Sequence, residues 1–192
     1  MIKYIALAVA ALLVGVDQWV KAWAYSGLTE RITVIPGIFY LTYLENTGAA
    51  FGLFQGRAFT LGIVSIAILA VVLYLLLSDR VKGRTLIWGL SLVFAGGVGN
   101  LIDRLALFNR LSRVDGLTQG FVIDYLDFSA LLNFPIFNLA DCFVVIGTVI
   151  MMVQILFFEG KKPVTEGTEP VNDPPETEDT KISDSEQTGE NS

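Results

Sequence analysis

The sequence predicts an all-α membrane protein: four transmembrane helices with a small extracytoplasmic β-sheet at the membrane surface. Three observations support this fold class. Of the 192 residues, 53% are hydrophobic, and the mean hydropathy of +0.60 is too high for a soluble domain of this size. Four apolar runs suit membrane helices, and the polar residues gather at the ends of these runs and in the connections between them.

The first apolar run covers residues 4–16 and has two interpretations. A secretory signal peptide would use Lys3 as its positive start and the AWA at 22–24 as its cleavage site. Trp19 and Trp23, near the end of the run, are more typical of an interfacial anchor. We therefore favour a first membrane helix that is retained.

The next segment, residues 28–57, predicts β-structure. It contains RITVI and IFYLTYL, which are rich in β-branched and aromatic residues and are separated by Pro36 and Gly37. We expect two strands in a small sheet on the membrane surface. The following NTGAAFG, at 46–52, concentrates small residues that let the backbone approach a ligand, although such a run is also typical of a plain turn.

Three further runs are uncharged and have lengths near the roughly 17–25 residues of a membrane helix, namely 58–77, 85–102 and 142–158. Four alternating spans place both long connections and the start of the last helix at the same membrane face. The short loop 78–84 lies at the other face and contains three basic residues. By the positive-inside rule, we expect both termini to be cytoplasmic.

The C-terminal residues 159–192 differ in composition from the body, residues 1–158. They contain ten of the nineteen acidic residues and three basic ones, so the tail carries −7 and the body +1. With almost no large apolar side chains, the tail cannot bury enough surface to offset its ordering entropy. We expect two parts: a membrane domain and a disordered acidic tail.

The sequence contains no histidine and one cysteine. Disulfides, Cys/His zinc sites and His-based nucleophile systems are therefore excluded within this chain. We expect no metal, no cofactor and no nucleic-acid partner. Any catalysis must use carboxylates, amides, Lys, Arg or hydroxyls.

Two carboxylates stand out near the start of the last helix. In FVIDYLDF, at 121–128, Asp124 and Asp127 point to opposite sides if the segment is extended, and we favour an extended segment or short turn that brings Asp124 inward. There it would meet Asp141. Two carboxylates in a low-dielectric site share a proton; one then acts as a base toward water while the other polarises a carbonyl, as in aspartic proteases.

Other polar and small residues show helical spacing that would place them on shared faces. These are the pair Asp17 and Lys21, the stripe Gly96, Asn100 and Arg104, and the pair Asn138 and Asp141.

Simpler interpretations of these residues stay open. Asp141 is also favoured by the macrodipole at a helix N-terminus, and Asp124 is compatible with a solvated loop. Asp17 is compatible with a structural ion pair to Lys21, and Arg104 with a side chain that snorkels to lipid head groups. Cys142 has no neighbouring base, so we expect it to be a core residue.

Five segments together resemble signal peptidase II, the bacterial lipoprotein signal peptidase family, over about residues 1–158. They are DQWVK (17–21), ENTGAAFG (45–52), GGVGNLIDR (96–104), FVIDYLDF (121–128) and FPIFNLAD (134–141). The resemblance implies an aspartic endopeptidase embedded in the bacterial cytoplasmic membrane. It would remove the signal peptide of diacylglyceryl-modified prolipoproteins just before the lipidated cysteine, near the extracytoplasmic face.

By this resemblance, Asp124 and Asp141 match the catalytic pair. Other positions match residues that shape or line the family's site, namely Asp17, Lys21, Asn46, Gly48, Gly96, Asn100, Arg104 and Asn138. The acidic tail is not part of the family pattern. We expect prolipoprotein substrates and membrane lipid as partners, and a monomeric enzyme.

Two other classes of function remain as alternatives. A small ion-coupled transporter would use Asp17 and Asp141 as relay groups and Arg104 as counter-charge. A non-catalytic scaffold would use the acidic tail as a docking arm. The nearly apolar cytoplasmic halves of the helices argue against the transporter.

Overall fold

The computed structural model describes residues 1–48, 58–107, 111–114, 117–132 and 134–159, all within one compact unit, Met1–Lys161. Among these residues, four helices are long and apolar enough to cross a membrane, as predicted. They are α1 (Ile2–Gly27), α2 (Ala58–Leu77), α3 (Arg84–Arg104) and α5 (Leu139–Gln154), which continues as a π-helical turn, Ile155–Glu159. The acidic tail lies outside the described residues, so its disorder stays a prediction.

Helix α1 is longer than the apolar run 4–16 that predicted it. It continues to Gly27 and contains Asp17 and Lys21, whose side chains are fully buried. The two charges form an ion pair of 2.9 Å one helical turn apart. Because each charge compensates the other, both can be buried, and the helix continues past them.

A three-stranded antiparallel sheet has the order β1-β2-β5, with β1 (Ile32–Ile35), β2 (Phe39–Asn46) and β5 (Val122–Asp127). All three strands confirm the predicted extended segments. Gly37 has a φ of +75° between β1 and β2, a conformation that glycine adopts without strain. In the β2–β5 pairing, Leu44 lies opposite Asp124.

Two elements were not predicted. Strands β3 (Leu111–Val114) and β4 (Leu117–Gly120) form a separate antiparallel pair, and α4 (Ser129–Leu132) is one short helix after β5. The dipeptide Asp115-Gly116, between two runs with apolar ends, is a hairpin signal that predicts the first of these.

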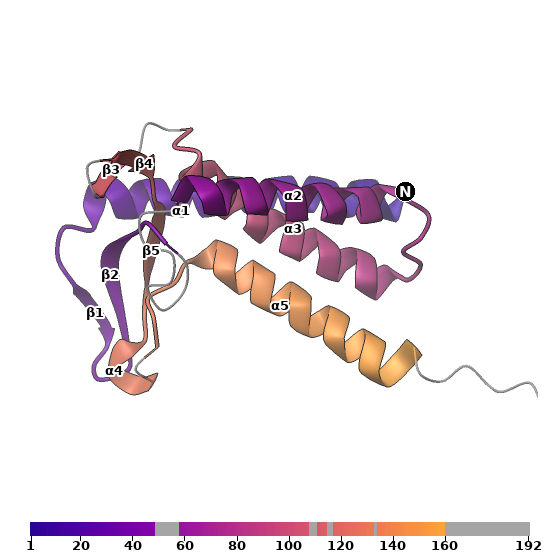
Figure 1. The fold of residues 1–192 in the computed structure, drawn as a ribbon. Helices are drawn as coiled ribbons and strands as arrows, with labels where there is room; N and C mark the ends of the chain where they lie inside the picture. Colours follow the sequence, from indigo (N-terminus) through magenta and orange to yellow (C-terminus); the bar gives the residue numbers. More distant parts are fainter. Residues whose placement is uncertain (49–57, 108–110, 115–116, 133, 160–192) are drawn as a thin grey trace, which may run out of the picture. The chain divides into compact units, whose positions relative to one another are not determined.

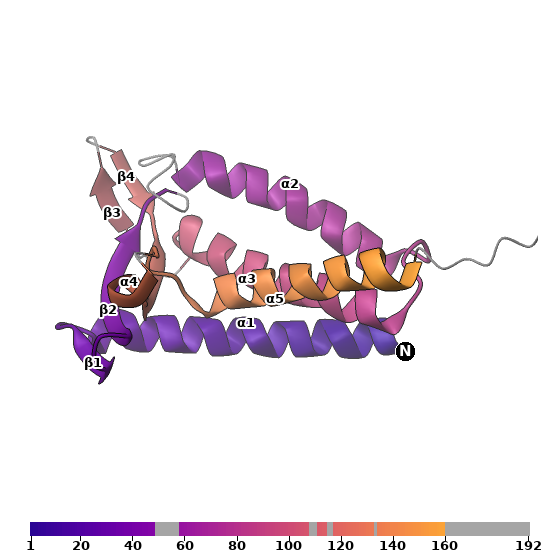
Figure 2. The same ribbon diagram turned by 90° about the horizontal axis from the view of Figure 1, so that it is seen from below.

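The three-stranded sheet lies at one end of the helices, and the N-terminus lies at the other (Figures 1 and 2). The last turns of α1 pack against β5 through a buried apolar cluster, made of Ala24, Leu28, Phe121, Ile123 and Tyr125. This contact holds β5 against the end of α1.

A short bridge attaches the segment before α5 to the same strand. The backbone N–H groups of Tyr125 and Leu126 both donate to the carbonyl of Phe137, at 3.0 and 2.8 Å, and the N–H of Phe137 donates to the carbonyl of Leu126 at 3.1 Å. The first turn of α5 therefore begins beside β5, although sixteen residues separate Tyr125 from Asp141 in sequence.

Helices α3 and α5 approach closely at small residues. A Cβ atom on Gly96 would overlap the carbonyl oxygen of Ala140, and one on Gly89 would lie 3.0 Å from the carbonyl oxygen of Gly147. Gly96 and Gly89 thus permit tight contact between the two helices. The next turn of α3, with Asn100, consequently faces the start of α5.

Large apolar side chains cover the outer faces of the helices. Phe59, Val71, Val145 and Leu156 are each more than half exposed. Water would penalise such continuous apolar surface, whereas lipid accommodates it. The exposed apolar faces thus agree with helices that cross a bilayer.

Candidate active site

Asp124 lies on β5 with its side chain almost completely buried. Its carboxylate accepts two hydrogen bonds from amide side chains. Asn46, at the end of β2, donates to Oδ2 at 2.8 Å, and Asn138 donates to Oδ1 at 2.6 Å. Asp124 is therefore a buried strand residue, and the alternative of a solvated loop acid is wrong.

Asp141 is the third residue of α5 and also accepts two hydrogen bonds. Asn100 of α3 donates from Nδ2 to Oδ1 at 2.8 Å, and the backbone N–H of Asn138 donates to Oδ2 at 3.1 Å. The N–H of Asp141 donates in return to Oδ1 of Asn138, which completes a capping box. Asn138 therefore precedes the helix with an extended backbone, and the expectation that it shares a helical face with Asp141 is wrong.

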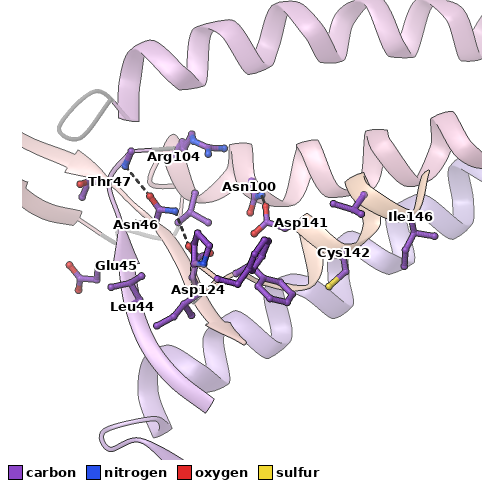
Figure 3. A pocket seen from close by; sticks show the side chains of 17 residues that line it. Leu44, Glu45, Asn46, Thr47, Asn100, Arg104, Asp124, Asp141, Cys142 and Ile146 are labelled. Carbon is purple, nitrogen blue, oxygen red and sulfur yellow. Dashed lines mark hydrogen bonds between the residues drawn. The ribbon is translucent and has the colours of Figure 1, made fainter. Parts of the chain in front are cut away.

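Asn138 connects the two carboxylates. Its side-chain amide donates to Asp124, while its backbone N–H donates to Asp141. Figure 3 shows Asp124 beside Asn46, and Asp141 beside Asn100, at one cavity. The sequence prediction that Asp124 lies inward, close to Asp141, agrees with this geometry.

Three side chains hold the N-terminus of α5. The N–H of Leu139 donates to the hydroxyl of Tyr125 on β5 at 3.3 Å, and the N–H of Ala140 donates to Oδ1 of Asp17 on α1 at 3.0 Å. The N–H of Asp141 uses Asn138, as described above. The first N–H groups of a helix have no partner within the helix, so these side chains both satisfy them and fix the position of Asp141.

Burial and charge raise the pKa of Asp124 to about 7. Burial is the largest cause, and the neighbouring Asp141 carboxylate raises the pKa further, against the hydrogen bonds from Asn46 and Asn138, which lower it. Below about pH 7, Asp124 therefore keeps its proton beside Asp141. A pair in this state can remove a proton from water and donate one to a carbonyl.

A cavity of about 720 Å³ opens beside the two carboxylates. Six residues that the sequence indicated line it: Asn46, Gly48, Asn100, Arg104, Asp124 and Asp141. Apolar side chains form much of the remaining wall, among them Leu44, Val122, Phe134, Phe137, Val145 and Ile146. This combination of a polar end and an apolar wall suits a ligand with both polar and apolar parts.

The other indicated residues lie behind the cavity. Gly96 sets the α3–α5 contact, and Asn138 joins the carboxylates. Asp17 and Lys21 form the expected ion pair, and the Nζ of Lys21 lies 2.9 Å from Asp103 as well. Sequence reasoning assigned no role to Asp103, although its position three residues after Asn100 was a signal.

Asp127 occupies the opposite side of β5, away from the cavity lining. Its carboxylate accepts hydrogen bonds from Thr42 at 2.6 Å and Ser129 at 2.5 Å, and Arg31 lies 3.0 Å away. Burial opposes ionisation, but these donors and Arg31 hold the pKa of Asp127 below its ordinary value. Asp127 is an ionised structural acid.

Two further expectations concern the same region. Cys142 is partly exposed and lines the cavity, so the expectation of a core residue is wrong. This follows from its place in the first turn of α5, beside the opening. The NTGAAFG segment lies outside the described residues after Gly48, whose N–H donates to Oδ1 of Asn46 at 3.0 Å. Across the described part of the chain, no group of three or more acidic, His or Cys residues could hold a metal ion.

Comparisons with known proteins agree on one family. Residues 9–157 match the family model described as signal peptidase (SPase) II. A lipoprotein signal peptidase of Clostridioides difficile (strain 630) is 40% identical over 81% of this chain and 97% of its own length. One from Enterococcus faecalis is 36% identical over 85% of this chain and 94% of its own.

Solved structures give the same result for the fold. A structure described as a bacterial membrane enzyme matches with a TM-score of 0.69 and 29% identity, covering 82% of this chain and 92% of its own. A second with the same description has a TM-score of 0.65 and 29% identity, covering 80% of this chain and 93% of its own.

Proposed function

Because the chain belongs to the signal peptidase II family, whose members cleave signal peptides from prolipoproteins, we propose that Asp124 and Asp141 are its catalytic pair. The observation that carries this proposal is the bridge through Asn138, which donates to both carboxylates. The raised pKa of Asp124 supports a shared proton. Membership in a peptidase family removes the transporter and scaffold alternatives as the main activity.

In the proposed reaction, the ionised carboxylate of the pair takes a proton from a water molecule, whose oxygen attacks the scissile carbonyl carbon. The protonated carboxylate donates its proton to the carbonyl oxygen, which gives a tetrahedral diol. When the diol collapses, the C–N bond breaks, the leaving nitrogen receives a proton from the protonated carboxyl group of the pair, and a hydroxyl of the diol gives its proton to the other carboxylate. The shared proton is thereby returned, and the chemistry needs no metal or cofactor.

The substrate we propose is a prolipoprotein whose cysteine carries diacylglycerol, cleaved just before that cysteine. Each buried methylene contributes roughly 0.8 kcal/mol, so two acyl chains hold the peptide firmly at the membrane. The apolar wall of the cavity, which includes Val145 and Ile146, suits those chains. The amide of Asn46 and the guanidinium of Arg104 lie at the polar end, where peptide carbonyls would bind.

We place this site near the extracytoplasmic face of the bacterial cytoplasmic membrane, with both termini in the cytoplasm and membrane lipid around residues 1–158. The basic loop around Arg80, Lys82 and Arg84 supports this orientation. An alkaline phosphatase fused after Ser192 should be inactive, since the reporter folds only outside the cytoplasm. An active fusion would contradict the proposed orientation.

We propose that one copy of the chain is sufficient. Asn46, Asn100 and Asn138 give each of the two carboxylates two hydrogen bonds, so neither carboxylate needs a group from a second copy. Light scattering of the purified enzyme should give the mass of a monomer in its detergent micelle. A dimer that loses activity on dissociation would contradict this.

The deciding experiment compares three isosteric variants of the purified protein on a diacylated lipopeptide. Asp124→Asn and Asp141→Asn each remove a titrating proton, so each should lose at least about 100-fold in rate. Asp127→Asn is the matched control, since it makes the same change on the other side of β5, and its effect on the rate should be mild.

Unmodified peptide of the same sequence should be a poor substrate, and a chelator should have no effect on the rate. Full activity of either Asp124→Asn or Asp141→Asn would reject the pair. An inactive Asp127→Asn beside an active Asp124→Asn would mean that the wrong acid of β5 had been chosen.

A further inference from the structure

We propose that Lys21 is a positioning residue for the reaction: its ammonium group sets the orientation of the Asn100 side-chain amide, so that the N–H of Asn100 faces Asp141. This inference rests on the proposed function of Asp124 and Asp141. It assigns a specific task to a buried lysine that does not line the cavity.

Lys21 lies among three polar groups. The side chain is fully buried, and its Nζ lies 2.9 Å from Oδ2 of Asp17, 2.9 Å from Oδ2 of Asp103 and 2.8 Å from Oδ1 of Asn100. The ammonium group donates a hydrogen bond to Asn100, and the two carboxylates lie at ion-pair distance from it. The direct hydrogen bond from Lys21 toward the reacting groups therefore runs through Asn100.

The hydrogen-bond partners of Asn100 decide where the oxygen and the nitrogen of its amide lie. The oxygen and nitrogen of an amide are nearly equal in size, so hydrogen-bond partners decide which way it points. Oδ1 of Asn100 accepts from Lys21 and, at 3.2 Å, from Nδ2 of Asn138, while Nδ2 donates to Asp141 at 2.8 Å.

A flipped amide would oppose this pattern on both sides. Its N–H would face the ammonium group of Lys21, which has no acceptor, and its oxygen would face the carboxylate of Asp141. The buried ammonium thus permits one orientation of Asn100. In that orientation Asn100 stabilises the ionised form of the pair and holds Asp141 in place.

The charged groups at the site, including the pair itself, come from five elements. These are Asp17 and Lys21 of α1, Asp103 and Arg104 of α3, Asp124 of β5, Asp141 of α5 and, at the cavity rim, Glu45 of β2. A test of Lys21 must therefore keep the net charge of these groups constant.

A charge-balanced double variant, Asp17→Asn with Lys21→Met, meets that condition. Asparagine at 17 keeps an oxygen that can accept from the N–H of Ala140, and methionine keeps the length of the side chain without its donors. A second double variant, Asp17→Asn with Lys21→Gln, restores an N–H donor toward Asn100. Lys3→Met is the matched control, since it removes an ammonium from the other end of the same helix, where Lys3 pairs with the exposed Asp79 and donates to the carbonyl of Ser78.

Cleavage of the diacylated lipopeptide is measured against pH for wild type and variants, with rates normalised to folded, monodisperse protein. The Met double variant should lose about 10- to 100-fold in maximal rate. Its acidic limb should move upward by about one pH unit, because the ionised pair has lost a hydrogen bond. The Gln double variant should recover part of both losses, and Lys3→Met should match wild type.

If Lys21 has only a structural role, both double variants should lose the same share of the maximal rate and keep the wild-type pH profile. That result would overturn the inference. If the Met double variant does not fold, Asp17→Asn with Lys21→Leu takes its place, since it also lacks a donor toward Asn100, and an unchanged acidic limb there also overturns the inference. The proposed function fails separately, if wild-type protein does not cleave or if Asp124→Asn retains full activity.

Discussion

At the scale of single residues, Asn138 explains why the candidate site uses asparagine. Its oxygen accepts from the N–H of Asp141, and its Nδ2 donates to both Asp124 and Asn100. An aspartate side chain at this position would have no donor for Asp124, and an aliphatic side chain would offer neither that donor nor an acceptor for the N–H of Asp141. One amide therefore caps α5 and links the two acids.

The pKa of Asp124 predicts how cleavage depends on pH. Because this pKa is raised to about 7, the pair keeps its shared proton below that pH and loses it above. The acid that protonates the scissile carbonyl then disappears, so the rate should fall as pH rises, approaching about tenfold per unit well above pH 7. Steady-state cleavage of the lipopeptide between pH 5 and about 9 measures this. A rate that stays flat to about pH 9 would contradict the assignment.

At the scale of elements, the neighbours of α5 fix the position of its first turn. Asp17 of α1 and Tyr125 of β5 accept its first N–H groups, the bridge at Phe137 attaches it to β5, and Gly96 lets α3 approach it closely. Since Asp141 lies in this first turn, any displacement of the helix also displaces a proposed catalytic group.

Gly96→Ala tests that coupling. The added Cβ would overlap the carbonyl oxygen of Ala140, which is backbone and cannot rotate away. We expect a loss of roughly 1–3 kcal/mol in stability, as for other overpacked sites, and a lower cleavage rate even in the folded protein. Thermal unfolding in detergent and lipopeptide cleavage measure the two effects.

Gly15→Ala is the matched control, since a Cβ there meets nothing within 4 Å. It should be neutral or slightly stabilising, because alanine favours helix more than glycine does. If Gly96→Ala proves as stable and active as Gly15→Ala, the close α3–α5 contact does not position Asp141.

At the scale of the whole molecule, the helices separate two environments. Their outer faces are apolar and exposed, whereas the buried acids and amides gather at the end that carries the three-stranded sheet (Figures 1 and 3). A lipid-anchored peptide is held at the membrane boundary, so a site at the ends of the helices meets its scissile bond there. The membrane thus contributes to positioning the substrate.

The acidic tail should not be needed for this task. No described residue that lines the cavity or bonds the two acids lies beyond residue 159, and the family match ends at residue 157. We expect a chain without residues 161–192 to cleave the lipopeptide within about twofold of the full-length rate. Loss of a catalytic group would lower the rate by roughly 10-fold or more. Loss of prolipoprotein processing on this deletion would instead give the tail a role.

By itself, the sequence determined the four membrane helices, the strands of the sheet and the kind of chemistry available. Helix and strand formation depends on apolar runs and on β-branched residues that are neighbours in sequence. The absence of histidine limited the choice of catalytic groups. The motifs also indicated Asp124 and Asp141, which the structure places at one cavity.

Only the tertiary structure decided which polar groups pair. Asn100 and Asp141 are 41 residues apart, and Asp17 and Ala140 are 123 apart, yet each pair forms a hydrogen bond. The role of Asp103 and the extended cap at Asn138 both depend on such contacts. A buried charge or amide takes whatever complementary partner the packing brings within about 3 Å, and packing is a property of the whole fold.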